Sequence, residues 1–259
     1  MRVMHVLDSL DHGGAEAVVV DLANAAAAEH EVTICCLRRV GALTERLDPA
    51  VHVICLGRPE GNDFTLPWRI ARVARQLDVE VVHSHSWGVF LEATLAATLA
   101  RARSVHTVHG PYLQHGNSGN QRCRAWLRRR LEHLAARKVE VIACVSTSLA
   151  EQVRNEMELP ARVVTVHNGI PEVAVPGEKA DLLDRGAEAR LVSVGRMAPV
   201  KAYEVLLRAF ATTLQRMPRL RLTLIGMAPR DSDSRDWRSD SVFGRASISS
   251  ASGTTSMRC

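Results

Sequence analysis

Long apolar runs are missing from this sequence of 259 residues. Apolar segments such as residues 51–56 and 79–83 are short, whereas a membrane-spanning helix needs about 20 apolar residues. Residues 1–7 lead directly into a strand-like pattern, without the apolar segment and cleavage site of a signal peptide. We therefore expect no transmembrane helix, no export and a cytoplasmic protein.

Paired cysteines and interleaved aromatic residues are also missing. The six cysteines form no pair of C-x-x-C motifs at zinc-binding spacing, and most stand in strand-like runs, as reduced core residues do. Basic residues are not interleaved with aromatic ones as on a nucleic-acid-binding sheet face, so we expect no nucleic-acid partner. The net charge of +5 selects no function, because the corresponding pI of about 9.1 is common among soluble enzymes.

The sequence does contain short β-branched runs that alternate with helical patterns, which is typical of a parallel sheet covered by helices on both faces. The expected fold class is therefore α/β. We predict strands at residues 2–7, 31–37, 51–56, 79–83, 104–108, 139–145 and 162–166. We predict helices at residues 15–28, 66–77, 89–102, 121–137 and 148–157. Together these elements complete a Rossmann-like domain at residues 1–170.

The rest of the chain is expected to begin a second domain. Residues 171–188 have the composition of a linker, and residues 189–229 supply one βαβ unit. Its elements are expected at residues 190–194, 203–217 and 220–225. Residues 230–259 are rich in Ser, Arg, Asp, Gly and Thr without strand or helix periodicity, so we expect a disordered tail. This change of composition suggests a truncated gene or an altered reading frame.

Two glycines follow the first predicted strand. Gly13 and Gly14 directly precede a helix, where a backbone without side chains can approach a ligand and exposed N–H groups favour anionic or hydroxyl-rich ligands. The spacing matches neither a dinucleotide fingerprint nor a Walker loop, so nicotinamide and ATP are not indicated. A tight turn without a ligand is the alternative interpretation.

Histidines gather where two predicted strands end. His83 and His85 follow the fourth strand, and His106 and His109 flank the fifth. Because open α/β sheets bind ligands at the carboxyl ends of their strands, we expect His85 and His109 near a crevice. For His83 and His106 a buried, hydrogen-bonded histidine is the better interpretation. Zinc is the rival hypothesis, but no Cys or carboxylate recurs at ligand spacing, and we expect no metal.

Short motifs follow one another in a fixed order along the chain. They are Gly-Gly-Ala-Glu at 13–16, His85, Thr-Val-His-Gly at 107–110, Val-Ser at 145–146, His-Asn-Gly-Ile at 167–170, and Val-Gly-Arg at 194–196 with Lys201. In this order they resemble family 4 glycosyltransferases over residues 1–229. The resemblance implies a GT-B architecture, with an acceptor domain, a nucleotide-sugar domain and a catalytic cleft. It also implies sugar transfer with retention from a UDP- or GDP-sugar, without a metal or resident cofactor.

The resemblance implies roles for single residues of the first domain. Gly13, Gly14, His85 and Asn168 would bind substrate. His109 would lie beside the transferred sugar, hydrogen-bond one of its hydroxyls and help stabilise positive charge at the anomeric carbon.

In the second domain, Arg196 and Lys201 match the cations that hold the donor diphosphate in the family. The departing nucleoside diphosphate carries negative charge that two cations can stabilise. A solvated helix end or a surface ion pair is the alternative for both. Ala202 stands where the family usually has glycine, so the turn geometry can differ there.

The family's E-x7-E element, expected downstream of Gly226, has no counterpart in the tail. The leading hypothesis is a hexosyltransferase, impaired by truncation, that acts on a glycan or lipid-linked acceptor. The alternative is a non-catalytic remnant that is inactive or only binds acceptor. A relative of GT-B epimerases or phosphorylases is a third hypothesis.

The predicted helix at 121–137 places Leu127, Leu131 and Leu134 on one face and arginines around the remainder. Since enzymes of this family often use lipid-linked acceptors, peripheral contact with an anionic membrane at its inner face is one hypothesis. An ordinary amphipathic helix with a solvated basic face is the other.

Overall fold

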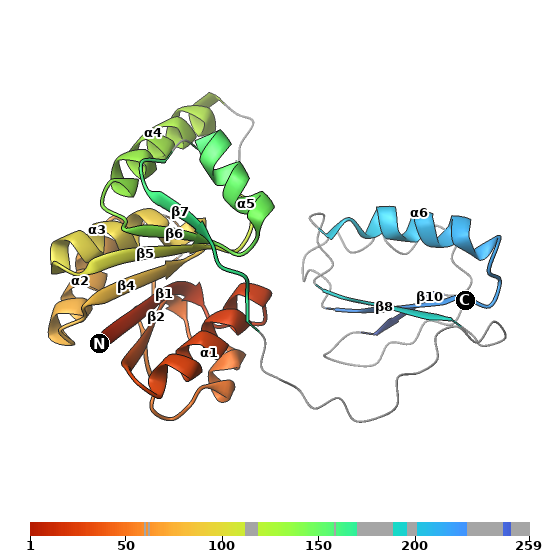
Figure 1. Cartoon of the computed structure of the whole chain (residues 1–259), viewed down its shortest axis with the longest axis horizontal. Helices are drawn as coiled ribbons and strands as arrows, with labels where there is room; N and C mark the ends of the chain where they lie inside the picture. Colours follow the sequence, from red (N-terminus) through yellow and green to blue (C-terminus); the bar gives the residue numbers. More distant parts are fainter. Residues whose placement is uncertain are drawn as a thin grey trace. The chain divides into compact units, whose positions relative to one another are not determined.

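The computed structural model describes residues 1–59, 61, 63–111, 119–157, 159–169, 189–195, 201–226 and 246–249. The chain divides into two compact units, Met1–Ala174 and Val175–Cys259. In the first unit seven parallel strands form one sheet in the order β3-β2-β1-β4-β5-β6-β7 (Figure 1). The predicted α/β fold class is confirmed.

The elements of the first unit lie close to their predicted positions. The strands are β1 Arg2–Ser9, β2 Glu31–Arg39, β3 His52–Cys55, β4 Val81–His85, β5 Arg103–Val108, β6 Val141–Cys144 and β7 Arg162–Thr165. The helices are α1 Gly14–Ala27, α2 Leu66–Gln76, α3 Phe90–Ala100, α4 Gly119–Ala136 and α5 Thr147–Gln152, with short turns η1 Ala42–Arg46, η2 Trp87–Val89 and η3 Val153–Met157. The last predicted helix is interrupted, because α5 ends at Gln152 and η3 continues it with π-helical geometry.

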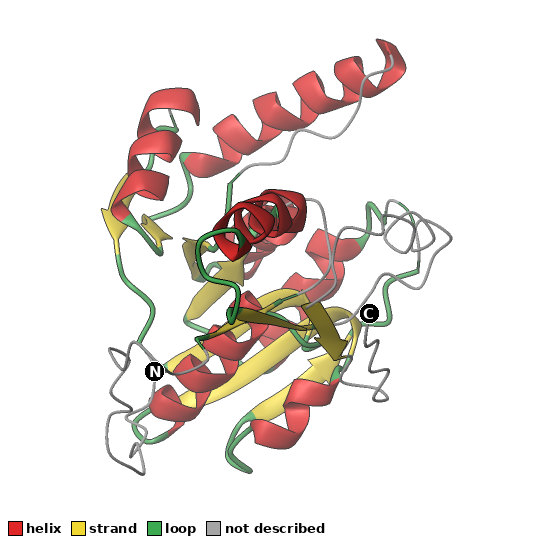
Figure 2. Ribbon diagram, turned by 90° about the vertical axis from the view of Figure 1, so that its right-hand side faces the viewer, coloured by secondary structure: helices red, strands yellow, loops and turns green. Residues whose placement is uncertain are grey.

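The sheet is buried on both faces. In β2, Cys35 and Leu37 belong to the core beneath α2 and α3, whereas Ile34 and Cys36 pack with residues of α1. Figure 2 shows helices on both sides of the yellow strands. Because alternate side chains enter two different cores, a strand of this kind reads as one continuous apolar run.

The order of the strands reverses beside β1. The chain runs outward from β1 through β2 to β3 and then returns to place β4 on the other side of β1. In the β1–β4 pair, His5 lies opposite His83. Open α/β sheets bind ligands at the carboxyl ends of the strands that flank such a reversal, so the topology marks the ends of β1 and β4.

The second unit confirms the predicted βαβ pattern. It contains β8 Arg190–Val194, α6 Tyr203–Leu214, β9 Arg221–Ile225 and β10 Ala246–Ser249, with parallel strands in the order β10-β9-β8. The residues that form its core are Tyr203, Phe210, Leu220, Leu222 and Leu224.

Four residues of the expected disordered tail are described as a strand. Ala246–Ser249 form β10, and Ala246 pairs with Leu222 of β9. Strand pairing joins backbone groups, so a polar composition does not prevent it. Residues 227–245 and 250–259 lie outside the described residues, as does the predicted linker at 171–188.

Arg101 closes α3 in an unfavourable backbone conformation. Its φ of 60° and ψ of 29° are left-handed, and its N–H donates to the carbonyls of Ala97 and Thr98. Glycine usually occupies this position after a helix because a Cβ atom there costs roughly 1–2 kcal/mol.

Arg101→Gly should therefore raise the free energy of unfolding by about 1 kcal/mol, since the steric cost disappears. Urea unfolding followed by circular dichroism measures this change. Arg72→Gly is the matched control, because Arg72 is exposed inside α2 and glycine there should cost about 1 kcal/mol. A lower free energy of unfolding for Arg101→Gly as well as for Arg72→Gly would contradict a steric cost at Arg101.

Candidate functional site

A cleft opens at the carboxyl ends of β5 and β6. Its volume is about 470 Å³, and the residues that line it are His109, Gly110, Pro111, Val145, Ser146, Ser148, Leu149 and Gln152. Ser146 stands before α5, and its Oγ accepts a hydrogen bond from the N–H of Leu149 at 3.3 Å. Two motifs that lie apart in the sequence, Val-Ser at 145–146 and the one containing His109, thus form one surface.

His109 follows β5 and occupies the inner side of this cleft. Its Nε2 lies 3.1 Å from Nδ1 of His85, and the two rings are 5.4 Å apart. Burial lowers the pKa of His109 to about 4, so the ring is neutral at pH 7. The structure therefore joins the two histidines that the sequence places near a crevice.

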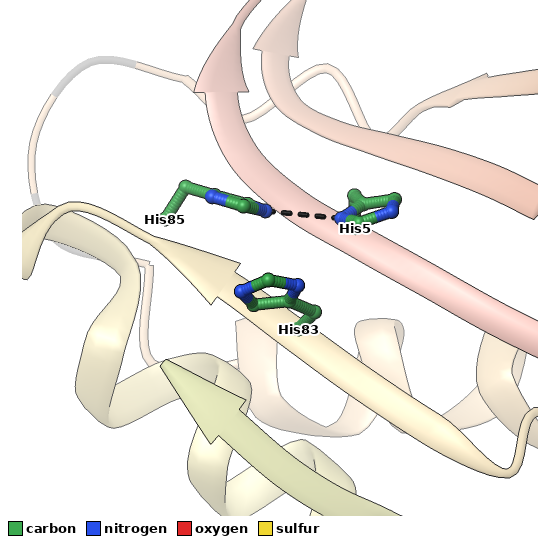
Figure 3. Close-up of side chains that lie close together, drawn as sticks. All are labelled: His5, His83 and His85. Atoms are coloured by element: carbon green, nitrogen blue, oxygen red, sulfur yellow. Dashed lines mark hydrogen bonds between the residues drawn. The ribbon is translucent and has the colours of Figure 1, made fainter. Parts of the chain in front are cut away.

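A third imidazole extends the contact into the interior of the sheet. His5 Nδ1 lies 3.0 Å from Nε2 of His85. Figure 3 draws this hydrogen bond as a dashed line. With the contact between His85 and His109, three rings form a hydrogen-bonded chain from β1 through β4 to His109. His5 and His85 are only 2 % and 3 % exposed. Sequence reasoning missed His5, because its proximity to His85 arises from the β1–β4 pairing and no local motif marks it.

The rings of this group are held neutral. Burial lowers the pKa of His5 to about 4. Burial, followed by the neighbouring imidazoles, lowers the pKa of His83 and of His85 well below the ordinary value. His83 packs its ring 4.2 Å from the ring of His85. Each ring therefore carries one proton and retains one lone pair at pH 7.

The burial of His85 argues against direct contact with a ligand. Both of its ring nitrogens are engaged, one by His5 and the other by His109. The predicted fourth strand at 79–83 also ends too early, because β4 continues to His85. Polar residues resemble a loop in sequence, but parallel pairing with β5 keeps them in the strand.

His83 and His106 each make one side-chain hydrogen bond, as their interpretation as structural histidines predicts. His83 Nε2 lies 2.7 Å from Oγ1 of Thr107, and His106 Nδ1 lies 2.8 Å from Oγ of Ser84. His106 is completely buried and packs 4.7 Å from the ring of Phe90. The hydrogen bond supports the interpretation for His83, whereas Nε2 of the buried His106 has no partner among the described residues.

Three histidines of this group have the composition of a metal site. One ring nitrogen from each of His5, His83 and His85 lies within 4.8 Å of the others. Neutral imidazoles bind zinc and copper ions. Since both nitrogens of His85 already take part in hydrogen bonds, a metal ion there would have to displace one of them. The absence of a metal stays a prediction.

The other predicted substrate residues lie at the same edge of the sheet. Gly13 and Gly14 follow β1, and Asn168 is exposed after β7. A Cβ atom on Gly14 would meet no atom within 4 Å, so the backbone there has open space. Gly13 has extended backbone, and a Cβ atom on it would meet the flexible side chain of Glu16. Only Gly14 therefore leaves room for a ligand at this turn.

In the second unit, Lys201 is exposed and stands two residues before α6, which begins at Tyr203. Arg196 lies outside the described residues. Ala202 has a φ of 50° and a ψ of 39°, so it occupies a left-handed position that favours glycine. The residue that replaces the usual glycine thus keeps a glycine-like backbone at a steric cost.

The ends of β8 and β9 approach each other closely. The N–H of Gly195 donates to the carbonyl of Ile225 at 2.9 Å, and a Cβ atom on Gly226 would lie 1.9 Å from the carbonyl oxygen of Gly195. The same oxygen accepts a hydrogen bond from the hydroxyl of Tyr203 at 3.0 Å. Gly226 is therefore required by packing between backbones.

A seven-stranded parallel Rossmann-like sheet, followed by a second βαβ unit, matches the architecture of the GT-B class. The chain belongs to Glycosyltransferase Family 4, whose sequence profile matches residues 12–172. That range contains Gly13, Gly14, His85, His109 and Asn168. No curated protein sequence matches the chain.

Solved structures share this fold at low sequence identity. HepE of Anabaena, in complex with UDP and glucose, is 17 % identical, with a TM-score of 0.69 over 96 % of this chain and 69 % of HepE. Sucrose-phosphate synthase from Thermosynechococcus elongatus is 16 % identical, with a TM-score of 0.67 over 98 % of this chain and 71 % of the synthase. S. aureus TarM is 8 % identical, with a TM-score of 0.67 over 96 % of this chain and 77 % of TarM.

The neutral histidines make stability depend on pH. Unfolded His5 takes up a proton near its ordinary pKa of 6.5, whereas folded His5 does so only near 4, so stability present above pH 6.5 is lost as the pH falls toward 4. His5 alone should lower the free energy of unfolding by about 2 kcal/mol between pH 7 and pH 5. Urea unfolding at both pH values measures the difference.

His5→Leu should remove that part of the pH dependence, because leucine does not titrate. His52→Gln, a change at an exposed histidine of β3, serves as the control and should leave it in place. If His5→Leu left the pH dependence of stability unchanged, His5 would not be its cause.

Proposed function

We propose that this glycosyltransferase moves a hexose from a nucleoside diphosphate sugar, a UDP- or GDP-sugar, to a glycan or lipid-linked acceptor with retention of configuration. The observation that carries the proposal is the position of His109, at the inner side of a cleft within the family-matched region. HepE, which shares the fold, is known in complexes with UDP and with UDP-glucose. TarM is known in a complex with UDP and sugar-containing ligands.

A neutral His109 suits the chemistry of sugar transfer. Positive charge develops at the anomeric carbon as the donor bond breaks, and an imidazolium beside it would repel that charge. A neutral ring, kept so by burial, offers a hydrogen bond to a sugar hydroxyl without this penalty. His109 is therefore the residue that we assign to catalysis.

The acceptor is proposed to enter from the first unit. Ser146, Ser148 and Gln152 place hydroxyl and amide groups along the cleft beside His109. Such groups donate and accept hydrogen bonds, which suits the hydroxyls of a glycan. Gly14 and Asn168, at neighbouring strand ends, are proposed as further substrate contacts.

The donor diphosphate is proposed to bind Arg196 and Lys201. Two cations can neutralise the charge of the departing nucleoside diphosphate, so transfer would need no metal or resident cofactor. The exposed position of Lys201 before α6 supports this role, because the N–H groups of a helix start also attract phosphate.

Calorimetric titration of the purified chain with UDP and with GDP tests the donor site. We expect saturable binding of one nucleotide, weakened about tenfold by Lys201→Ala, since a lost charge-assisted contact is worth about 1.5 kcal/mol. Lys138→Ala, at an exposed lysine of the first unit, should have no effect. Absence of binding by a folded chain would favour the alternative, a non-catalytic remnant that only binds acceptor.

Membrane contact is the second part of the proposal, and α4 supports it. The leucine face of this helix is exposed: Leu127, Leu131 and Leu134 are 53 %, 43 % and 55 % accessible. An ordinary amphipathic helix would pack such a face inward, and here the inward face holds Glu132 and Ala136 instead. The exposed leucine face supports membrane contact over an ordinary amphipathic helix with a solvated basic face.

The inward face of α4 is occupied by an ion pair, which explains the reversal. Arg128 Nε donates to Oε1 of Glu132 at 2.7 Å, and Arg128 Nη2 lies 3.7 Å from Oε2 of Glu92 on α3. Glu132 is 1 % exposed and its carboxylate is paired with Arg128, so this face of α4 turns inward and the leucines remain outside.

The exposed face combines apolar and basic groups. Trp126 is 59 % exposed, and the guanidinium of Arg130 lies 5.3 Å from the centroid of its ring. Apolar side chains beside arginines suit the boundary between acyl chains and anionic headgroups. None of the described helices has the length and apolarity needed to span a bilayer. We propose that α4 rests on the inner face of the cytoplasmic membrane, next to a lipid-linked acceptor.

Sedimentation with vesicles tests this surface. The chain should bind anionic vesicles more tightly than neutral ones, and a variant with Leu127→Ser and Leu134→Ser should bind about tenfold more weakly, since less apolar surface is buried. Leu95→Ser with Leu99→Ser, at exposed leucines of α3, is the control. Equal binding to neutral vesicles would exclude the electrostatic contribution, and unchanged binding of the α4 variant would exclude the helix.

A further inference from the structure

The imidazole chain has two different ends. At the inner end, Nε2 of His5 is buried and has no hydrogen-bond partner among the residues that the structure describes. At the outer end, Nε2 of His109 is bonded to His85, and His109 lines the cleft with its other nitrogen unpaired within the described part of the chain. The nitrogen of His5 that carries the proton therefore determines, through the hydrogen bonds to His85 and His109, which nitrogen of His109 carries its proton.

Only two arrangements keep all three rings neutral and both hydrogen bonds intact. In the inward arrangement, Nε2–H of His109 donates to His85, and Nε2–H of His85 donates to His5. His5 then carries its proton on Nε2. In the outward arrangement, Nδ1–H of His5 donates to His85, Nδ1–H of His85 donates to His109, and His109 carries its proton on Nδ1.

The inner end discriminates between the two. The inward arrangement leaves a buried N–H of His5 without an acceptor, whereas the outward arrangement leaves only a buried lone pair without a donor. Orphaned buried N–H groups are rarer in proteins than acceptors that lack a donor. Burial lowers the pKa of His5 to about 4, so His5 does not become a doubly protonated imidazolium at pH 7.

We propose that His85, with His5 behind it, is a positioning residue that holds His109 as the Nδ1–H tautomer. The remaining ring nitrogen of His109 is then a hydrogen-bond donor at the cleft. The use of this donor on a sugar hydroxyl rests on the proposed function, whereas the tautomer does not. The pattern resembles metal-binding and catalytic histidines generally, in which the partner of one nitrogen fixes the proton on the other.

Nitrogen-15 NMR of the whole chain, labelled in its histidines, reads the tautomer directly. Long-range proton–nitrogen correlation at pH 7 distinguishes the protonated nitrogen of each ring from the bare one, and His109→Gln assigns the signals of His109. We expect a protonated Nδ1 on His109 in the unchanged chain. A protonated Nε2 overturns the proposal without any variant.

Two substitutions at one position test the cause. His85→Leu removes the donor to Nε2 of His109 and should move the proton of His109 toward Nε2, the preference of free histidine. His85→Asn places an amide N–H near the former Nδ1 and should restore the Nδ1–H tautomer. No change with His85→Leu in a folded chain, or no recovery with His85→Asn, overturns the proposal.

His106→Asn is the matched control, because His106 is buried in the neighbouring strand and bonded to Ser84, outside the chain of three rings. It should leave the signals of His109 unchanged, and a change would show that any core substitution disturbs them and would overturn the assignment. No substrate enters the experiment. A chain that binds no nucleotide but shows the tautomer would contradict only the proposed function, and the reverse result only this inference.

Discussion

The site depends on keeping imidazole rings neutral inside a parallel sheet. His5 and His85 are almost completely buried at the point where the strand order reverses, and a charged ring there would lose its hydration. Each neutral ring needs a hydrogen-bond partner that is itself uncharged, and the neighbouring histidines are such partners. The candidate catalytic ring, His109, is the point at which this buried network reaches the cleft.

The second consequence of burial is the direction in which α4 faces. The hydrophobic pattern of the sequence does not reveal it, because the leucines of α4 have the spacing of a core-facing stripe. The charged pair of Arg128 and Glu132 takes the inner position and leaves those leucines to another environment. The inward-facing ion pair of α4 thus leaves leucines at the surface, and the buried histidines of the sheet lead to His109 at the cleft.

Sequence reasoning recovered the strands and helices because buried parallel strands read as continuous apolar runs. It recovered His109 because residues after such strands meet at one edge. It could not find His5, whose partner is 80 residues away and arises from strand order alone. It placed His85 outside its strand and expected no strand in the tail, since polar side chains conceal backbone pairing in β4 and β10. It also did not show which face of α4 turns inward, because hydrophobic periodicity does not detect the ion pair of Arg128 with Glu132.

The central position of β1 also constrains how the chain assembles during synthesis. During synthesis β1 is paired on one edge by β2, but its other edge stays unpaired until β4 is made, after β3 and α2. Until then the backbone of β1 presents unpaired groups and His5 is open to water and to protons. The pH during that interval therefore determines whether the ring of His5 is neutral when β4 pairs with β1.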